Sequence, residues 1–159
     1  MRHRIIQEIA SSVVAAGGVD NIIQALVESA TRGTEAKGCS LLILRDDEPV
    51  LEHRISYGMS EDYPYREQLL EKGAMEQVLK GTPLLAWDVA SDPRILHKEE
   101  AKKEGVVSIV FLPIHHQEKL RGVMRLFFSE KRKFDREELD FLDSIAELVT
   151  TMLETDKAK

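Results

Sequence analysis

The stretch VVSIVFLPI, Val106–Ile114, decides the fold because it holds one hydroxyl side chain and otherwise only apolar ones. Side chains along an extended strand point alternately to the two faces of a sheet, so Ile109 and Phe111 share one face while Val110 and Leu112 share the other. A strand that is apolar on both faces has to be covered on both. The sequence therefore predicts a buried strand with one layer of structure on each side.

The segments around this strand are predicted from apolar periodicity and from turn residues. Strands are predicted at 39–44, 50–57, 84–89, 106–114 and 119–129, and helices at 1–18, from Asp20 toward Gly38, at 73–80, from Asp92 to Gly105 and at 135–155. The hairpin-length connections favour an antiparallel sheet, and the pattern as a whole is typical of the α+β class. We expect the terminal helices, which are the most apolar, to cover one face and the middle segment to cover the other.

The helix predicted from Asp92 to Gly105 is the most charged element of the chain. An aspartate can accept the free N–H groups of a helix start, and the proline that follows it suits the first helical position. We expect Ile95, Leu96 and Ala101 to face the sheet and the charged side chains to face water. A thin cover of this kind over an apolar sheet is where a small-molecule pocket can form.

Length and composition indicate one soluble globular domain spanning 1–159. With 22 basic against 28 acidic residues the net charge is -6, so the basic excess of a nucleic-acid-binding surface is missing. We expect no membrane partner, because no apolar stretch is long enough to cross a bilayer and no secretory pattern is present. Cys39 is the only cysteine, which excludes an internal disulfide, and the cytoplasm is the expected compartment.

Five stretches resemble the GAF domain family, a regulatory module found in phosphodiesterases, sensor kinases, phytochromes and bacterial regulators. They are, in order, KGCSLLILRDD, SYGMSEDY, VLKGTPLLAWDVASDPR, EGVVSIVFLPI and LRGVMRLFFSEKRKFDREELDFLDSIA. The resemblance implies a central antiparallel sheet with the terminal helices on one face, and with short helices and loops over a ligand pocket on the other. It also implies signal transduction: the pocket binds a small molecule, and the terminal helices pass the change to a neighbouring domain or a dimer partner.

The resemblance leaves the ligand and any cofactor unknown, since relatives bind cyclic nucleotides, haem, bilins, amino acids or nothing. The Asn-Lys…Phe…Asp-Glu pattern of cyclic-nucleotide-binding relatives has no clear counterpart at 127–135. The Cys-His pair of bilin-binding relatives falls on Leu96 and His97, so covalent bilin attachment there is not possible. His97 is either the axial ligand of a haem-type sensor or a surface residue of the charged helix.

No catalytic residues and no metal site are predicted, and we expect the protein not to be an enzyme. The free methionine-R-sulfoxide reductase branch of the family needs an attacking and a resolving thiol, whereas Cys39 stands alone at the start of an apolar strand. His115 and His116 fall in a predicted turn, where adjacent side chains diverge.

Candidate ligand-binding residues come from the end of the third strand, from the charged helix and from the two strands that follow. They are Trp87, Asp88, His97, Ser108, Phe111 and Arg125. Arg125 interrupts an apolar strand, where an unpaired charge is costly to bury, so it faces an anionic ligand, pairs with Asp88 or reaches solvent. Trp87 is expected in the core in every case.

Two function classes remain open. The first is a small-molecule-sensing regulatory module. The second is a dimerisation or protein-interaction module without a ligand, in which a second apolar stripe at Phe141 and Leu148 of the last helix meets another subunit. In either class the domain acts on a separate signalling partner or forms part of a longer receptor.

Overall fold

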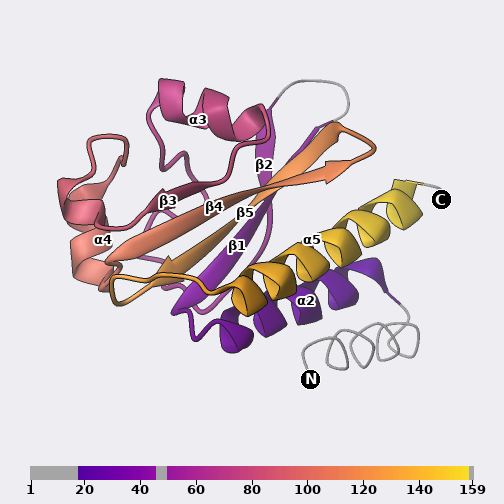
Figure 1. Ribbon diagram of the computed structural model, residues 1–159, viewed down its shortest axis with the longest axis horizontal. Helices are drawn as coiled ribbons and strands as arrows, with labels where there is room; N and C mark the ends of the chain where they lie inside the picture. Colours follow the sequence, from indigo (N-terminus) through magenta and orange to yellow (C-terminus); the bar gives the residue numbers. More distant parts are fainter. Residues whose placement is uncertain (1–17, 46–49, 158–159) are drawn as a thin grey trace.

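The computed structural model describes residues 18–45 and 50–157, so the predicted N-terminal helix, 1–18, falls outside the described residues except for Gly18. The elements, in chain order, are α2 (Val19–Gly33), β1 (Gly38–Leu44), β2 (Leu51–Tyr57), α3 (Lys72–Leu79), β3 (Leu84–Ala86), the short 3₁₀ helix η1 (Val89–Ser91), α4 (Lys98–Glu104), β4 (Ser108–His116), β5 (Lys119–Phe128) and α5 (Arg136–Lys157) (Figure 1).

The strands form one antiparallel five-stranded sheet in the order β2-β1-β5-β4-β3. The predicted α+β class and the antiparallel sheet are therefore confirmed. β5 lies in the middle of the sheet, between β1 and β4, and β3 is an edge strand. This order places β1, β5 and β4 in the interior of the sheet, where both of their faces can be covered.

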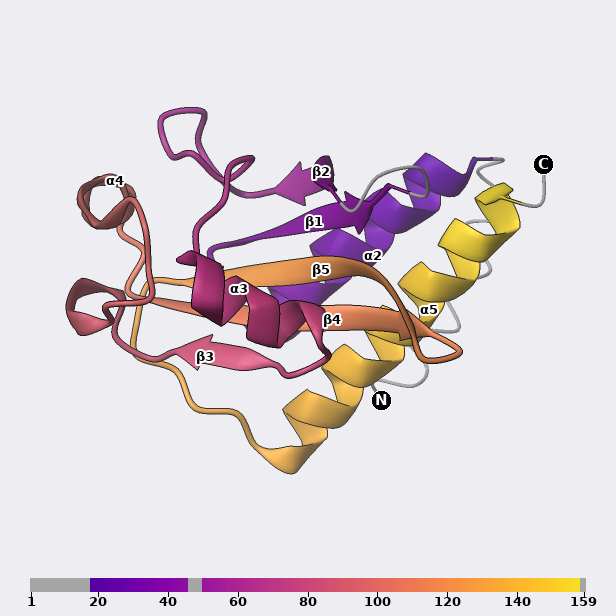
Figure 2. The same cartoon turned by 90° about the horizontal axis from the view of Figure 1, so that it is seen from above.

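Helices α2 and α5 cover one face of the sheet, which we call the helix face (Figures 1 and 2). Ile23 and Leu26 of α2 and Ile145 and Val149 of α5 are buried there against alternate residues of the strands, such as Leu126. The helix spacing of these residues places them on one stripe of each helix, as predicted.

The opposite face, which we call the lid face, is covered by α3, α4 and the loops around them. The buried members of its core are Tyr63, Tyr65, Leu69, Leu70, Ala74, Met75, Val78, Leu84, Ala86, Val89, Ile95, Ala101, Val106, Ile109, Phe111, Val123 and Phe127. Coverage of both faces follows the prediction made from the stretch 106–114. The segment 60–71, read from the sequence as polar loop, contributes four of these side chains.

The charged helix is shorter than predicted, because Asp92 does not start it. The Asp92 carboxylate accepts hydrogen bonds from the Arg94 backbone N and from its guanidinium, at 2.9 Å and less, and these bonds hold its pKa below the ordinary value. Ile95 then forms an isolated antiparallel bridge with Leu70, and α4 begins only at Lys98. Leu96 is 37% exposed and does not face the sheet, whereas Ile95 and Ala101 are buried as predicted.

Two strand ends also differ from the prediction. β3 stops at Ala86 because residues 89–91 turn into η1. His115 and His116 belong to β4, and the hairpin turn falls on Gln117 and Glu118, both of which have positive φ.

The start of α5 is set by a pair of reciprocal hydrogen bonds, as its sequence predicts. The Glu138 backbone N donates to the Asp135 carboxylate at 2.8 Å, and the Asp135 backbone N donates to the Glu138 carboxylate at 3.3 Å. This is a capping box, which satisfies two of the N–H groups left free at a helix start. Asp20, by contrast, lies inside the first turn of α2 and pairs with Arg54 at 2.6 Å.

Candidate functional site

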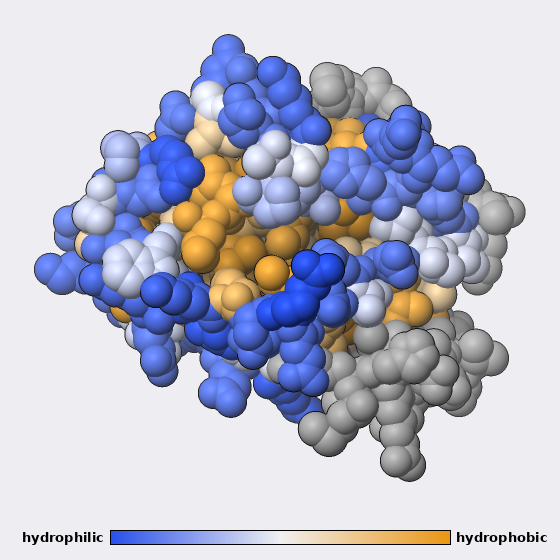
Figure 3. All heavy atoms as spheres, viewed as in Figure 1, coloured by the Kyte–Doolittle hydropathy of each residue, from blue (hydrophilic) through white to orange (hydrophobic). Residues whose placement is uncertain are grey.

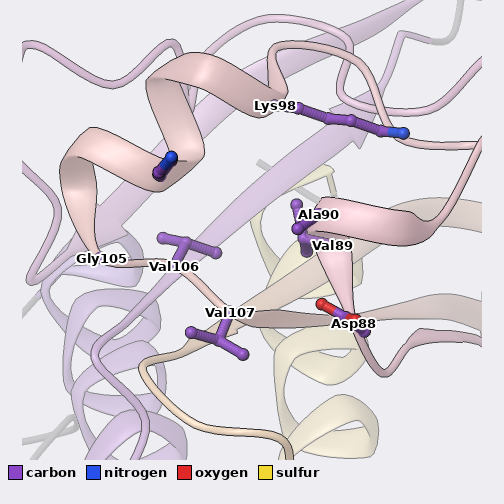
Figure 4. Close-up of a pocket in the computed structure, with 8 residues that line it drawn as sticks. Asp88, Val89, Ala90, Lys98, Gly105, Val106 and Val107 are labelled. Carbon is purple, nitrogen blue, oxygen red and sulfur yellow. The ribbon is translucent and has the colours of Figure 1, made fainter.

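A hollow of about 240 Å³ lies between α4 and η1, at the margin of the lid face. Its lining comes from residues 88–90 at the start of η1, from two lysines of α4 and from the chain entering β4: Asp88, Val89, Ala90, Lys98, Lys102, Gly105, Val106 and Val107. In Figure 4 the Lys98 side chain runs along one side of the hollow, away from Val106 and Val107, and Asp88 lies near the start of η1. Val89 and Val106 also belong to the lid-face core, so the hollow reaches the core from outside.

The two lysines of the hollow lie one helical turn apart on α4. At this spacing they share one side of the helix, and both take part in lining the hollow. Gly105 ends α4 with φ 82°, and a side chain there would meet nothing within 4 Å. The hollow therefore combines an apolar floor with positive charge on one side and the Asp88 carboxylate on the other.

Asp88 and Trp87 lie at the sheet edge rather than in the core. Asp88 accepts a hydrogen bond from Ser91 Oγ at 2.9 Å, and its carboxylate lies 3.9 Å from Lys131 Nζ. Trp87 is 44% exposed, and Lys131 Nζ lies 4.7 Å from the centroid of its ring in a cation–π contact. The expectation that Trp87 is a core residue is wrong: Leu84 and Ala86 take the lid-face positions of edge strand β3, so the alternate residues Leu85 and Trp87 point outward.

Arg125 lies in the middle of the sheet on the lid face and is completely buried. Its Nε donates to Ser40 Oγ at 3.0 Å, its Nη1 donates to the Glu67 carbonyl at 2.9 Å, and its Nη2 donates to the Tyr65 carbonyl. Within 18–45 and 50–157 it has no carboxylate partner, so it neither pairs with Asp88 nor reaches solvent, the two structural alternatives expected from the sequence. Burial lowers the pKa of Arg125 to about 10, which keeps it cationic at neutral pH.

Two further polar groups lie on the lid face near Arg125. Tyr63 is 1% exposed, its ring packs edge-on against Phe127 at 5.7 Å, and its hydroxyl has no hydrogen-bond partner among the described residues. His53 of β2 packs edge-on against Tyr65 at 5.5 Å, and its buried Nε2 likewise has no partner in the described part of the chain. Burial raises the pKa of Tyr63 and lowers that of His53, so both groups are neutral near pH 7.

The predicted residues are thus divided among several places. Phe111 is buried on the lid face, opposite Arg125 across the β4–β5 pair. Ser108 is on the other face of β4, the one that carries Val110, and its Oγ donates to the Glu130 carbonyl at 2.7 Å. Only Asp88 lines the hollow.

His97 lies on the outside of the lid, at the start of α4. It adopts the left-handed conformation, φ 60°, which is uncommon for a residue other than glycine. Its Nδ1 lies 2.8 Å from Glu100 Oε2, and its Nε2 lies 3.6 Å from Glu67 Oε2. Both ring nitrogens are engaged by carboxylates, so this geometry gives no support to a haem-type sensor.

Sequence reasoning did not single out His53, Tyr63 or the two lysines of α4 as site residues. The alternation of the predicted strand was only a partial signal for His53: it puts His53 in phase with Leu51, which packs on the lid face, but also with Ile55, which a bulge in the β1–β2 pairing puts on the helix face. Tyr63 carried none, since its position depends on how segment 60–71 folds over the sheet.

A second hollow, of about 360 Å³, lies on the charged outer surface and is lined by Asp62, Glu100, Lys103 and Glu104. There the Glu104 carboxylate accepts hydrogen bonds from Ser60 N at 2.8 Å and from Ser60 Oγ at 2.7 Å, which ties the start of segment 60–71 to α4. Among the described residues no group of three or more His, Cys, Asp or Glu side chains is placed to hold a metal ion. None of the described helices combines the length and the apolar character needed to span a membrane.

The fold and the coverage of its two faces are those of a regulatory domain class. The family model described as GAF domain matches residues 16–154, and the chain belongs to this family. GAF domains are regulatory modules, common in sensor kinases and phytochromes. No curated protein matched the chain.

Solved structures of GAF domains are similar to this chain over nearly its whole length. The GAF domain of a phosphoenolpyruvate-protein phosphotransferase from Coxiella burnetii has a TM-score of 0.80 and 20% identity, covering 99% of this chain and 95% of that one. The corresponding Acinetobacter domain has a TM-score of 0.71 and 17% identity, covering 99% and 92%. A phycoerythrobilin-bound GAF domain from a cyanobacterial phytochrome has a TM-score of 0.70 and 18% identity, covering 96% and 94%. At these identities the likeness establishes the fold alone.

Proposed function

We propose that this GAF domain is a sensory module that binds a small molecule on the lid face and transmits the change through its helices. The observation that carries this proposal is the hollow between α4 and η1, which is open to solvent and floored by the lid-face core. Its lining falls within and next to the segment 88–104, where we expected ligand contacts. A bilin-binding relative of the same fold lends support to a small organic ligand.

The chemistry of the hollow favours a ligand with an apolar body and an anionic group. Valine and alanine side chains would contact the apolar body, and Lys98 and Lys102 would attract the anionic group. Of the predicted ligand-binding residues, Asp88 contributes directly, while Phe111 and Arg125 lie deeper on the same face. Trp87, His97 and Ser108 would act only after a rearrangement.

The route to the helices is short, because one strand serves both faces. β4 places Phe111 on the lid face and Val110 and Ile114 against the helices, and Thr150 Oγ1 of α5 donates to the His115 carbonyl at 3.2 Å. A shift of β4 on ligand binding would therefore reach α5 directly. The role is regulatory rather than catalytic, and the cytoplasm is the compartment we propose.

A thermal-shift screen with hydrogen exchange tests this proposal. A ligand at one hundred times its dissociation constant stabilises the folded chain by about 2.7 kcal/mol, and we expect slower exchange within 88–104. Lys102→Ala should weaken binding, while Lys103→Ala, on the neighbouring position outside the hollow, should not. A ligand that stabilises the chain and leaves exchange in 88–104 unchanged would refute the proposed site.

An interaction module is the second candidate, and an exposed apolar patch favours it. Leu85 and Trp87 of the β3 edge and Leu139 of α5 are exposed. In Figure 3 hydrophobic surface extends over β3 and β4, between α3 and α5, with hydrophilic surface around it. The stripe predicted for this role is not available, because Phe141 is buried in the helix-face core and Leu148 packs against it. Homodimerisation or binding of a separate signalling protein through this patch is the form that we propose for the second candidate.

A further inference from the structure

The Arg125 guanidinium at the centre of the lid face is hydrogen-bonded only to neutral groups within the described chain. This arrangement suggests that an anion could compete with those groups for the guanidinium. We propose that an anionic ligand takes the place of the Tyr65 and Glu67 carbonyls on Arg125, and thereby releases segment 60–71 from the sheet. The inference rests on the proposed sensory function and names both the ligand class and the first structural response. The ligand class is a small molecule with a carboxylate or a phosphate group.

The partners of Arg125 explain why an anion would compete. A guanidinium carries five N–H donors, and those of Arg125 bond one serine hydroxyl and two backbone carbonyls within the described chain. None of these acceptors carries a charge, although burying a cation is costly unless it is paired. Hydrogen bonds to a charged oxygen are roughly twice as strong as those to a neutral one. An anion would therefore be a better partner than the carbonyls.

Two unpartnered polar atoms supply the second, independent observation. The Tyr63 hydroxyl is buried without a partner in the described chain, and so is His53 Nε2. Buried polar groups of folded proteins are nearly always hydrogen-bonded, so each such group needs an explanation. The Tyr63 and Arg125 side chains both pack against the Phe127 ring, at 5.7 and 5.8 Å, which brings the hydroxyl into the surroundings of the cation. As a donor, the hydroxyl suits an anion bound at Arg125.

Segment 60–71 is joined to the lid by contacts that would transmit its release. Ser60 bonds Glu104, Glu67 faces His97, the Leu96 N–H donates to the Leu69 carbonyl at 2.9 Å, and the Glu71 N–H donates to the Arg94 carbonyl at 2.7 Å. These contacts connect the segment to residues 94–104 along most of its length. Displacement of the two carbonyls on Arg125 would therefore be felt by the lid as well.

The experiment compares anionic and neutral probes of similar shape on the full chain. We would titrate succinate, inorganic phosphate and the neutral diamide succinamide by calorimetry, and follow exchange of segment 60–71 by mass spectrometry. The expected result is that succinate or phosphate binds, succinamide does not, and exchange in 60–71 becomes faster on binding. Preference for succinate over phosphate, or the reverse, assigns the source of the charge.

Variants separate this inference from the proposed function. Tyr63→Phe removes only the unpartnered hydroxyl, keeps the ring in place, and should weaken anion binding by about five- to tenfold. Arg125→Lys retains the charge but loses the forked geometry, and should weaken binding further; circular dichroism checks that each variant folds. Equal binding of the neutral probe, or of the Tyr63→Phe variant, overturns the inference, and so does the absence of binding by both anions. A ligand that slows exchange in 88–104 but leaves 60–71 unchanged overturns it too, while leaving the sensory function intact.

Discussion

Individual residues decide how closely the helices and strands of this domain pack together. Gly33, at the end of α2, is the clearest case. A Cβ atom there would lie 2.4 Å from Cε2 of Phe141, a ring buried in the helix-face core. The ring cannot move aside without disturbing its neighbours, since interiors are close-packed.

We predict that Gly33→Ala destabilises the protein even though alanine favours helices. Overpacking of this kind typically costs about 1–3 kcal/mol of the free energy of unfolding, measured by urea denaturation. Ser29→Ala, one turn earlier on the same helix, serves as the control and should change stability by less than about 0.5 kcal/mol. Equal effects of the two substitutions would contradict the packing argument.

The buried thiol of Cys39 predicts a fall of stability at alkaline pH. Burial raises the pKa of Cys39 from 9.0 to about 12, so between these values the unfolded chain loses the thiol proton while the folded chain keeps it. The folded state then binds more protons, and the free energy of unfolding falls by up to about 1.4 kcal/mol per pH unit. The effect begins about one pH unit below 9.0, where the unfolded thiol starts to ionise, and levels off above about 12.

Denaturation of the wild type and of Cys39→Ala, compared between about pH 8 and 10, measures this effect. Arg125, whose pKa is lowered to about 10, adds an opposite trend toward the upper end of this range, but it does so in both proteins, so the difference between them reports Cys39. The variant should show a shallower alkaline slope, whatever its absolute stability, and the slope that remains comes from groups such as Tyr63, whose pKa burial also raises. A slope that is the same in both proteins would show that another group causes it.

At the scale of elements, the strands and helices with strong local signals were predicted and the start of the charged helix was not. Alternation and turn residues are local properties, and they located β1, β2, β4, β5, α3 and α5. The Asp92-Pro93 pair looked like a helix start, but the Asp92 carboxylate is taken by Arg94 two residues later. No residue spacing in the sequence predicts that Arg94 would compete with the helix N–H groups for the Asp92 carboxylate.

The site itself was predicted in part, for a related reason. Strand alternation, a period of two, grouped Phe111 with Ile109 on one face of their strand, whereas the sequence left three alternatives open for Arg125. The partners of Arg125 are backbone carbonyls about sixty positions away along the chain, at Glu67 and Tyr65, and any residue type supplies a carbonyl. The orientation of Trp87 depends on which side chains of the short edge strand β3 face the lid. A strand of three residues is too short for its sequence pattern to specify this.

The capping box gives a prediction for α5. Asp135→Ala removes the acceptor of the Glu138 N–H and should cost about 0.5–2 kcal/mol of stability, measured by urea denaturation. Asp143→Ala, an exposed position in the middle of the same helix, is the matched control and should have little effect. If the control costs as much, the loss reflects helix charge rather than the cap.

At the scale of the whole molecule, the sheet joins two layers with different stability requirements. The helix face buries long apolar stripes of α2 and α5, whereas the lid face buries a cation and two unpartnered polar atoms. Elements that move on ligand binding are drawn from the less stable parts of a fold. The lid is therefore the layer that we expect to respond first.

The exposed apolar patch gives a prediction at this scale. If Trp87 and Leu139 bind a partner or a second copy, Trp87→Ser with Leu139→Lys should abolish that association in analytical ultracentrifugation. The free energy of unfolding should change by less than about 1 kcal/mol, because both side chains are exposed. Leu96→Ser, an exposed leucine on the lid, is the control. Association that survives the double substitution would place the interface elsewhere.

Arg94 has one more role, at the outer edge of the sheet. Its Nη2 donates to the Leu85 carbonyl of β3 at 3.3 Å, and β3 itself is only three residues long. An unprotected edge can serve as a template on which further chains add, the first step toward fibrils. The Arg94 guanidinium bound to that backbone blocks the addition of a further strand. The domain can therefore expose apolar side chains at this edge for a partner without forming fibrils.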